Sequence, residues 1–155
     1  MNTFFRIDDR LIHGQIMTTW SKVTGAKKII IIDDETAQDV FICGIMKKTI
    51  PKHIQLEILN TEKGIEYLKA NDDACTIVLM KTPDVFLELL KHGISAKQLN
   101  VGGMGMKGGR KNVYKNIAVS SEELQTFKEI SEEYGVDVEF KILPGDKGTS
   151  LKRII

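Results

Sequence analysis

Short apolar runs alternate with segments of helically spaced apolar residues along this chain. Residues 29–32 are four consecutive isoleucines, which is typical of a parallel strand buried on both faces. Residues 14–23 instead carry Met17, Trp20 and Val23 at helical spacing, and Gly25 ends that segment. The same alternation predicts strands over 3–8, 28–32, 55–59, 75–80, 98–101, 117–119 and 136–143, helices over 14–23 and 37–49, and further helices that begin near Thr61, Pro83 and Ser120.

Strands separated by helices favour an α/β fold. We expect a single domain over residues 1–155, with an open, mostly parallel sheet of about six or seven strands and helices on both faces. Such sheets bind ligands at the carboxyl ends of their strands. Three loops are predicted to lie there: the one before His13, the acidic turn 33–35 and the glycine-rich segment 102–111.

Composition narrows the function classes. The net charge of +1 gives no case for bulk nucleic-acid binding or for adhesion to a membrane surface. No apolar run approaches the roughly 18 residues of a membrane span. The first residues lack the pattern of a signal peptide, so we expect a cytosolic protein. Cys43 and Cys75 follow no metal or redox spacing and are expected to be reduced, buried thiols.

His13 is the strongest candidate for chemistry. A neutral imidazole is a competent nucleophile toward phosphorus near neutral pH. Asp8 or Asp9 could orient the ring, and Arg10 could compensate the charge of phosphoryl oxygens. The helix that begins near Gly14 offers unpaired backbone N–H groups to the same oxygens. The alternative is that His13 is only a polar helix cap beside a surface ion cluster.

The segment 102–111 formally contains the spacing GxGxxG. It follows the fifth predicted strand instead of the first, and no apolar-periodic helix opens within it, which argues against dinucleotide binding. We interpret it as a mobile basic flap in which Met104 and Met106 offer apolar contact. A long surface turn is the alternative. The side chains that could compensate phosphate charge are those of Lys107, Arg110 and Lys111.

Four aspartates suggest a different class of site. Asp8, Asp9, Asp33 and Asp34 could bind magnesium, as in a receiver domain phosphorylated on aspartate. That class needs an acceptor aspartate at the end of the third strand, where this chain has Asn60. We therefore favour acids that cap helices and pair with bases, and we predict no metal.

The remaining histidines and large aromatic residues are assigned no site. His53 and His92 are expected to be structural or solvated, and His92 suits the negative end of a helix dipole. Trp20 and Phe41 are expected to pack helix faces onto the sheet.

The segment Arg6-Ile-Asp-Asp-Arg-Leu-Ile-His13-Gly-Gln15 resembles the active-site signature of the IIB components of the mannose/fructose/sorbose family of the bacterial sugar phosphotransferase system. Residues 99–104 and 116–120 are also similar to the family's pattern, and the order of strands and helices fits from end to end. The interior, 105–115, departs most from that pattern.

The resemblance implies a concrete activity. A phosphohistidine on a IIA partner donates its phosphoryl group to His13, at Nδ1, and His13 passes it to a hexose or related sugar held by the membrane IIC/IID permease. Arg10 matches the motif's arginine, whereas Asp8, Asp9 and Gln15 match by position. No cofactor, metal or nucleotide is implied.

The resemblance also implies a setting. The protein would be a cytoplasmic subunit that associates peripherally with its permease. We expect exposed Leu11, Ile12 and Met106 to form an apolar docking patch around His13. A non-catalytic phosphate- or nucleotide-binding regulatory module on the same fold is the alternative.

Overall fold

A seven-stranded sheet in the order β3-β2-β4-β1-β5-β8-β9 forms the centre of the computed structural model, which describes residues 3–70 and 75–155. Every neighbouring pair is parallel except β8 and β9. The strands are β1 (Thr3–Asp8), β2 (Lys28–Ile32), β3 (Gln55–Leu59), β4 (Thr76–Met80), β5 (Gln98–Gly103), β8 (Asp137–Phe140) and β9 (Thr149–Ser150). A separate antiparallel hairpin pairs β6 (Arg110–Tyr114) with β7 (Ile117–Ser120). The predicted open, mostly parallel sheet is confirmed.

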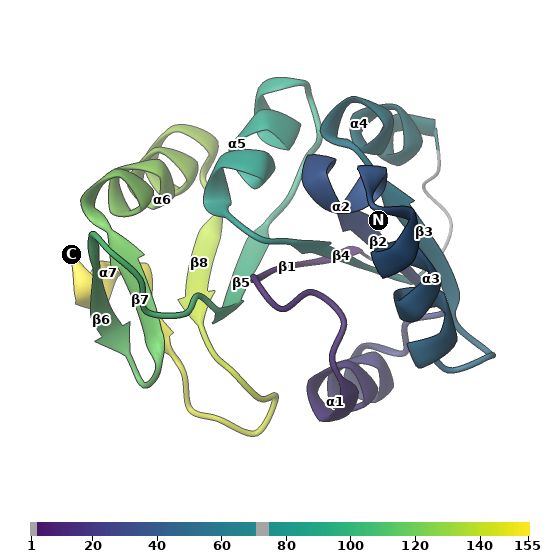
Figure 1. Cartoon of the computed structure of the whole chain (residues 1–155). Helices are drawn as coiled ribbons and strands as arrows, with labels where there is room; N and C mark the ends of the chain where they lie inside the picture. Colours follow the sequence, from purple (N-terminus) through teal and green to yellow (C-terminus); the bar gives the residue numbers. More distant parts are fainter. Residues whose placement is uncertain (1–2, 71–74) are drawn as a thin grey trace.

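Helices cover both faces of this sheet (Figure 1). One apolar core lies beneath α4, α5 and α6 and includes Phe5, Ile7 and Phe86. The other lies beneath α1 and α3 and includes Trp20 and Ile31. The helices are α1 (Gly14–Thr24), α2 (Asp34–Gln38), α3 (Val40–Thr49), α4 (Thr61–Ala70), α5 (Pro83–Lys91), α6 (Ser121–Tyr134) and α7 (Leu151–Ile154).

Strands β1 and β5 form the switch point of the sheet. The chain leaves β1 toward β2 on one side and leaves β5 toward β8 on the other. Connections that diverge in this way leave a crevice beyond the carboxyl ends of the two strands. The loops 9–13 and 104–109 therefore meet at this crevice.

Helix boundaries follow local capping chemistry. Gly25 ends α1 in the left-handed conformation at φ 69°, as predicted. The predicted helix 37–49 is wrong: α2 and α3 are separate, because Asp39 is extended and caps α3 by accepting from the Ile42 N–H at 3.0 Å. Thr61 is not the cap of α4, since the Asn60 side chain accepts from the Lys63 N–H at 2.8 Å.

The region after β5 differs most from the prediction. Residues 102 and 103 belong to β5, and a β-hairpin follows the loop. Strand β8 ends at Phe140, and the tail forms β9 and α7. The hairpin was not predicted because β6 is mostly polar, and only Val113 and Tyr114 pack against the core.

Individual packing predictions had mixed outcomes. Trp20 is buried as predicted, but Phe41 is 74% exposed, because Met46 and Ile50 take the core-facing positions around α3. Cys43 and Cys75 are free thiols, half-buried and not fully buried. None of the helices in the described ranges has the length and hydropathy of a membrane span.

Candidate functional site

His13 lies in the loop between β1 and α1, as the N-cap residue of α1. The loop leaves β1 in a tight turn in which the Leu11 N–H donates to the Asp8 carbonyl at 2.9 Å. Leu11 adopts φ 56°, a left-handed conformation that is rare for leucine, while its side chain is buried in the core beneath α1. The turn leaves the His13 side chain 25% exposed at the carboxyl end of β1.

The Asp8 carboxylate is the centre of the site. It is fully buried and accepts from Arg10 Nε at 3.0 Å and Arg10 Nη2 at 3.1 Å. Arg6 Nη2 donates to it at 3.2 Å, and His13 Nε2 lies 3.3 Å from its Oδ2. Of the two aspartates that were candidates to orient the ring, Asp8 makes this contact.

The charge state of Asp8 decides the tautomer of His13. Burial by itself would raise the pKa of Asp8, but hydrogen bonds from Arg10 and the charges of Arg6 and Arg10 outweigh it, so the pKa lies below its ordinary value. An ionised carboxylate only accepts hydrogen bonds. His13 Nε2 must then carry the ring proton when the imidazole is neutral, and the lone pair resides on Nδ1.

Arg6 is a residue of the candidate site that sequence reasoning missed. Its guanidinium is buried and lies 5.1 Å from the centre of the Trp20 ring. Burial lowers the pKa of Arg6, and Asp8 partly offsets that effect. The alternation of side chains along a strand could have identified Arg6 as a neighbour of Asp8, because positions 6 and 8 of one strand lie on the same face. The acceptors that hold Arg6 are the side chains of Asp8 and Asn100 and the carbonyls of Lys141 and Ile142.

Two glycines of β5 make room for this buried ion pair. The register between β1 and β5 shifts between Ile7 and Asp8, so that Asp8 pairs with Gly103. A Cβ on Gly102 would lie 1.9 Å from the guanidinium carbon of Arg6. A Cβ on Gly103 would lie 2.4 Å from Asp8 Oδ1. Gly102 and Gly103 therefore serve the close approach of buried side chains, and the place of Gly103 in the formal motif needs no dinucleotide.

Asp9 ties the glycine-rich loop to the site. Its Oδ2 accepts from the Gly105 N–H at 2.8 Å, and its own N–H donates to the Gly103 carbonyl at 2.9 Å. Asp9 therefore orders the loop instead of the histidine ring.

Arg110 was expected to help compensate the charge of a phosphoryl group, but in the structure it is buried in an ion pair. Its side chain is 2% exposed and pairs with Glu123 at 2.8 Å. It also donates to the Gly105 carbonyl at 2.7 Å. Burial would raise the pKa of Glu123, but the hydrogen bonds from Arg110 and from the Ser120 backbone outweigh it, so the pKa of Glu123 lies below its ordinary value. Arg110 therefore holds the glycine-rich loop at the Gly105 carbonyl.

The other predicted contact residues fall into two groups. Lys107 and Met106 are exposed on the loop, whereas Met104 is buried, contrary to expectation. The predicted docking patch is also corrected, because Leu11 is buried and Ile12 is half-buried.

The start of α1 is described in part. Gly14 begins the helix, is exposed and faces open space. The side chain of Gln15 lies outside the described part of the structure.

The second pair of aspartates caps helices. The Asp33 side chain accepts from the Thr36 N–H at 3.0 Å and pairs with Lys81 at 3.3 Å. Asp34 Oδ1 accepts from the Thr61 N–H at 2.7 Å. Across residues 3–70 and 75–155, no three His, Cys, Asp or Glu side chains are grouped to hold a metal ion.

The other two histidines are solvated, as expected. His53 is exposed in the loop after α3. His92 Nδ1 lies 2.8 Å from the Glu88 carbonyl at the end of α5.

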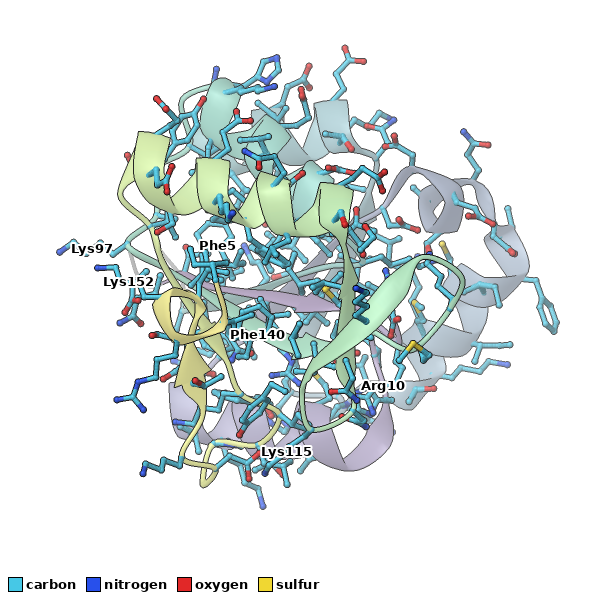
Figure 2. The ribbon with its side chains drawn as sticks, turned by 90° about the vertical axis from the view of Figure 1, so that its left-hand side faces the viewer. Phe5, Arg10, Lys97, Lys115, Phe140 and Lys152 are labelled. Carbon is cyan, nitrogen blue, oxygen red and sulfur yellow. The ribbon has the colours of Figure 1, made fainter. Side chains whose placement is uncertain are left out.

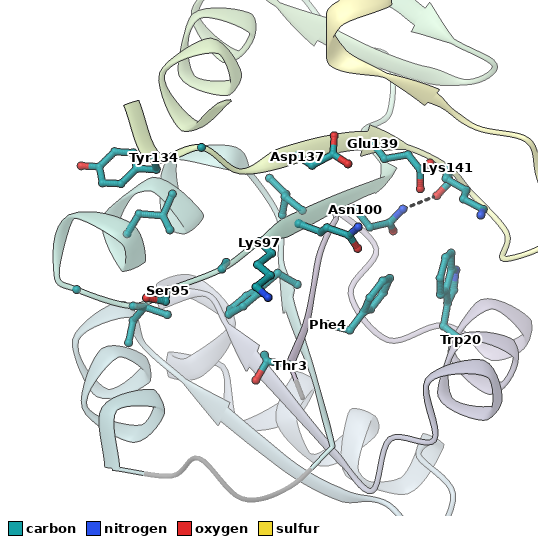
Figure 3. A pocket seen from close by; sticks show the side chains of 18 residues that line it. Thr3, Phe4, Trp20, Ser95, Lys97, Asn100, Tyr134, Asp137, Glu139 and Lys141 are labelled. Carbon is teal, nitrogen blue, oxygen red and sulfur yellow. Dashed lines mark hydrogen bonds between the residues drawn. The ribbon is translucent and has the colours of Figure 1, made fainter. Parts of the chain in front are cut away.

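An open groove in the structure is separate from His13 but is lined by residues that contact Arg6. Figure 2 shows Arg10 and Lys97 toward opposite ends of the molecule, as expected at the carboxyl end of β1 and just before the amino end of β5. The groove shown in Figure 3 is lined by Phe4, Trp20 and Asn100, but not by His13. Trp20 and Asn100 also contact Arg6, so Arg6 connects the wall of the groove to Asp8.

Comparisons with known proteins match this chain over nearly its whole length. The family model described as PTS system sorbose subfamily IIB component matches residues 2–155. The sorbose-specific EIIB component of Klebsiella pneumoniae is 29% identical over 151 residues, which are 96% of this chain and 92% of that protein. The fructose-specific EIIB component of Bacillus subtilis is 30% identical over 152 residues, 97% of this chain and 93% of that protein.

Solved structures and fused relatives extend the comparison. The crystal structure of the IIBSor domain of the Klebsiella pneumoniae sorbose permease superposes with a TM-score of 0.90 at 30% identity, covering 99% of this chain and 96% of that one. The mannose-specific EIIAB component of Escherichia coli is 28% identical over 97% of this chain, which corresponds to 47% of that protein.

Proposed function

The chain belongs to the sorbose subfamily of IIB components of the sugar phosphotransferase system, and we propose that His13 is the residue that carries its phosphoryl group. As a IIB component, the protein is a phosphohistidine–sugar phosphotransferase that phosphorylates a sugar during transport. The observation that carries the assignment of His13 is the contact between its Nε2 and the buried, ionised Asp8. This contact leaves the Nδ1 lone pair available at a partly exposed ring.

In the first step, the Nδ1 lone pair forms a bond to phosphorus while the bond from phosphorus to the donor histidine breaks. The bonding electron pair returns to the donor ring. His13 keeps its Nε2 proton, so its phosphorylated ring is a cation, and the Asp8 carboxylate at 3.3 Å stabilises that cation.

In the second step, a sugar hydroxyl oxygen displaces Nδ1 from phosphorus. The hydroxyl proton passes to solvent and the electron pair returns to Nδ1.

Transfer between two histidines is nearly balanced in free energy, so the protein mainly positions the groups and compensates charge.

Arg10 is the proposed partner of the phosphoryl oxygens. Its side chain is 45% exposed and shares Asp8 with the histidine ring, which supports a place beside the reacting group. The backbone N–H groups at the start of α1, near Gly14, would add donors, and Gln15 and the exposed Lys107 remain in the proposed set. Asp9 contributes by holding the loop, and Arg110 is removed from the phosphoryl-binding set.

Membership in the family implies a IIA donor and a IIC/IID permease as partners, and one relative is a fused EIIAB component. We propose that residues 1–155 act as one IIB domain that receives its phosphoryl group from IIA on the cytoplasmic side. The sugar bound by the permease would then be the final acceptor.

The decisive experiment is phosphorylation in a reconstituted system. The protein is incubated with phosphoenolpyruvate, the general phosphotransferase proteins and a cognate IIA. We expect an acid-labile, alkali-stable phosphate that is lost in His13→Ala and retained in His53→Ala and His92→Ala. Phosphate that persists in His13→Ala would refute the assignment of His13.

A further inference from the structure

Asp8 has two cationic partners that differ in accessibility. The Arg6 side chain is 1% exposed, whereas that of Arg10 is 45% exposed. Within the part of the chain that the structure describes, the Arg10 side chain donates its hydrogen bonds to Asp8. Arg10 can therefore leave Asp8 without breaking any other contact described for it.

Arg6, in contrast, is fixed from three directions. It donates to Asn100 on β5 and to the carbonyls of Lys141 and Ile142 after β8, and Trp20 of α1 covers its guanidinium. The absent side chain of Gly102 provides its space. A partner protein that binds at the surface therefore does not need to displace Arg6.

The Asp8 carboxylate would keep hydrogen-bond donors on both oxygens if the Arg10 side chain moved away. Its Oδ2 would keep Arg6 Nη2 at 3.2 Å and His13 Nε2 at 3.3 Å, and its Oδ1 would keep the Arg10 backbone N–H at 3.1 Å. Without Arg6, the same departure would leave a buried carboxylate with no arginine partner, which is strongly unfavourable.

We infer that Arg6 is a positioning residue that holds Asp8 in place while the Arg10 side chain leaves Asp8 and donates to the phosphoryl group on His13. The inference rests on the proposed function of His13. In this exchange Arg10 replaces its hydrogen bonds to Asp8 with hydrogen bonds to the phosphoryl oxygens. No proton is transferred, and no covalent bond forms or breaks. A phosphoryl dianion attracts the exposed guanidinium more strongly than a carboxylate already paired with Arg6.

The test compares the arginine Nε–H resonances of the full chain before and after phosphorylation through IIA. Arg10→Lys and Arg6→Lys each remove one signal and thereby assign both. We expect the Arg10 resonance to move on phosphorylation and the Arg6 resonance to stay. An unmoved Arg10 resonance in protein that carries phosphate on His13 would overturn the inference and leave the proposed function intact. Failure to phosphorylate His13 would overturn both.

A kinetic measurement separates positioning from folding. In Arg6→Lys we expect the rate of transfer from phospho-IIA to fall about 100-fold, because a small displacement of Asp8 misaligns the ring. The KM for IIA should not change, since Arg6 is buried. The preference of His13 for the Nε2–H tautomer, measured from the NMR chemical shifts of its ring nitrogens, should be lost in the same variant.

Two further variants provide controls. Gly102→Ala displaces Arg6 without removing its charge and should reproduce the loss of the tautomer. Arg110→Lys also removes a buried guanidinium, but one that pairs with Glu123, and should leave the tautomer unchanged. A wild-type rate and tautomer in folded Arg6→Lys would overturn the inference.

Discussion

Asp8→Asn is the substitution that most directly tests the electrostatics of this site. The change keeps the size of the side chain but removes the charge that balances Arg6. The Arg6 guanidinium is 1% exposed and would remain in the interior without its carboxylate. Removing one partner of such a buried pair costs about 3–5 kcal/mol. The asparagine amide would also place its own N–H groups against the N–H donors of Arg6, Arg10 or His13, where no hydrogen bond can form.

The sign of the pH dependence follows from the pKa of Asp8, which the folded state lowers. A lowered pKa stabilises the fold above the ordinary carboxyl value of about 4, and the contribution is lost as the pH falls through the lower folded value. The difference in stability between wild type and Asp8→Asn should therefore be complete at pH 7 and shrink as the pH drops below about 4.

Urea unfolding followed by tryptophan fluorescence measures this difference. The chain has one tryptophan, Trp20, which stacks on Phe4 and contacts Arg6. Asp146→Asn is the matched control. The hydrogen bond from the Leu143 N–H and the pairing with the exposed Lys115 also lower the pKa of Asp146, but no buried cation depends on this carboxylate, so the variant should stay close to wild type. Equal stability of wild type and Asp8→Asn at pH 7 would refute the description of a buried, ionised pair.

Three other substitutions test separate parts of the structure. Arg10→Lys should slow transfer from phospho-IIA about 100-fold in rapid-quench measurements, because lysine keeps the charge but loses the planar fork, and an unchanged rate would contradict its role. Gly103→Ala should lower the free energy of unfolding by about 1–3 kcal/mol in urea titrations, since its Cβ would lie 2.4 Å from Asp8 Oδ1, whereas Gly108→Ala faces open space and should be tolerated. Ser120→Ala removes the Ser120 Oγ that accepts a hydrogen bond from the Glu123 N–H at the start of α6 and should cost about 1 kcal/mol in the same assay; no loss would show that this side-chain cap does not stabilise α6.

Much of the fold followed from local pattern. The isoleucine run of β2 and the proline at the start of α5 identified those elements because burial and capping act within a few residues. The hairpin β6–β7 was not predictable in the same way, since β6 is mostly polar and gains its place by pairing with β7. The break at Asp39 was missed because an aspartate inside an apolar-periodic stretch can either lie in a helix or cap a new one.

The sequence by itself determined the alternation of strands and helices in an α/β fold and the edge of the sheet at which the candidate site lies, and it indicated His13 as the proposed nucleophile. Only the tertiary structure decided that Asp8 orients the ring, that Arg6 balances Asp8, and that Arg110 pairs with Glu123. The reason is physical: periodicity assigns a residue to a face, whereas its partner depends on register and packing between distant segments. Arg6 meets Asn100 only because β1 and β5 are neighbours in the sheet.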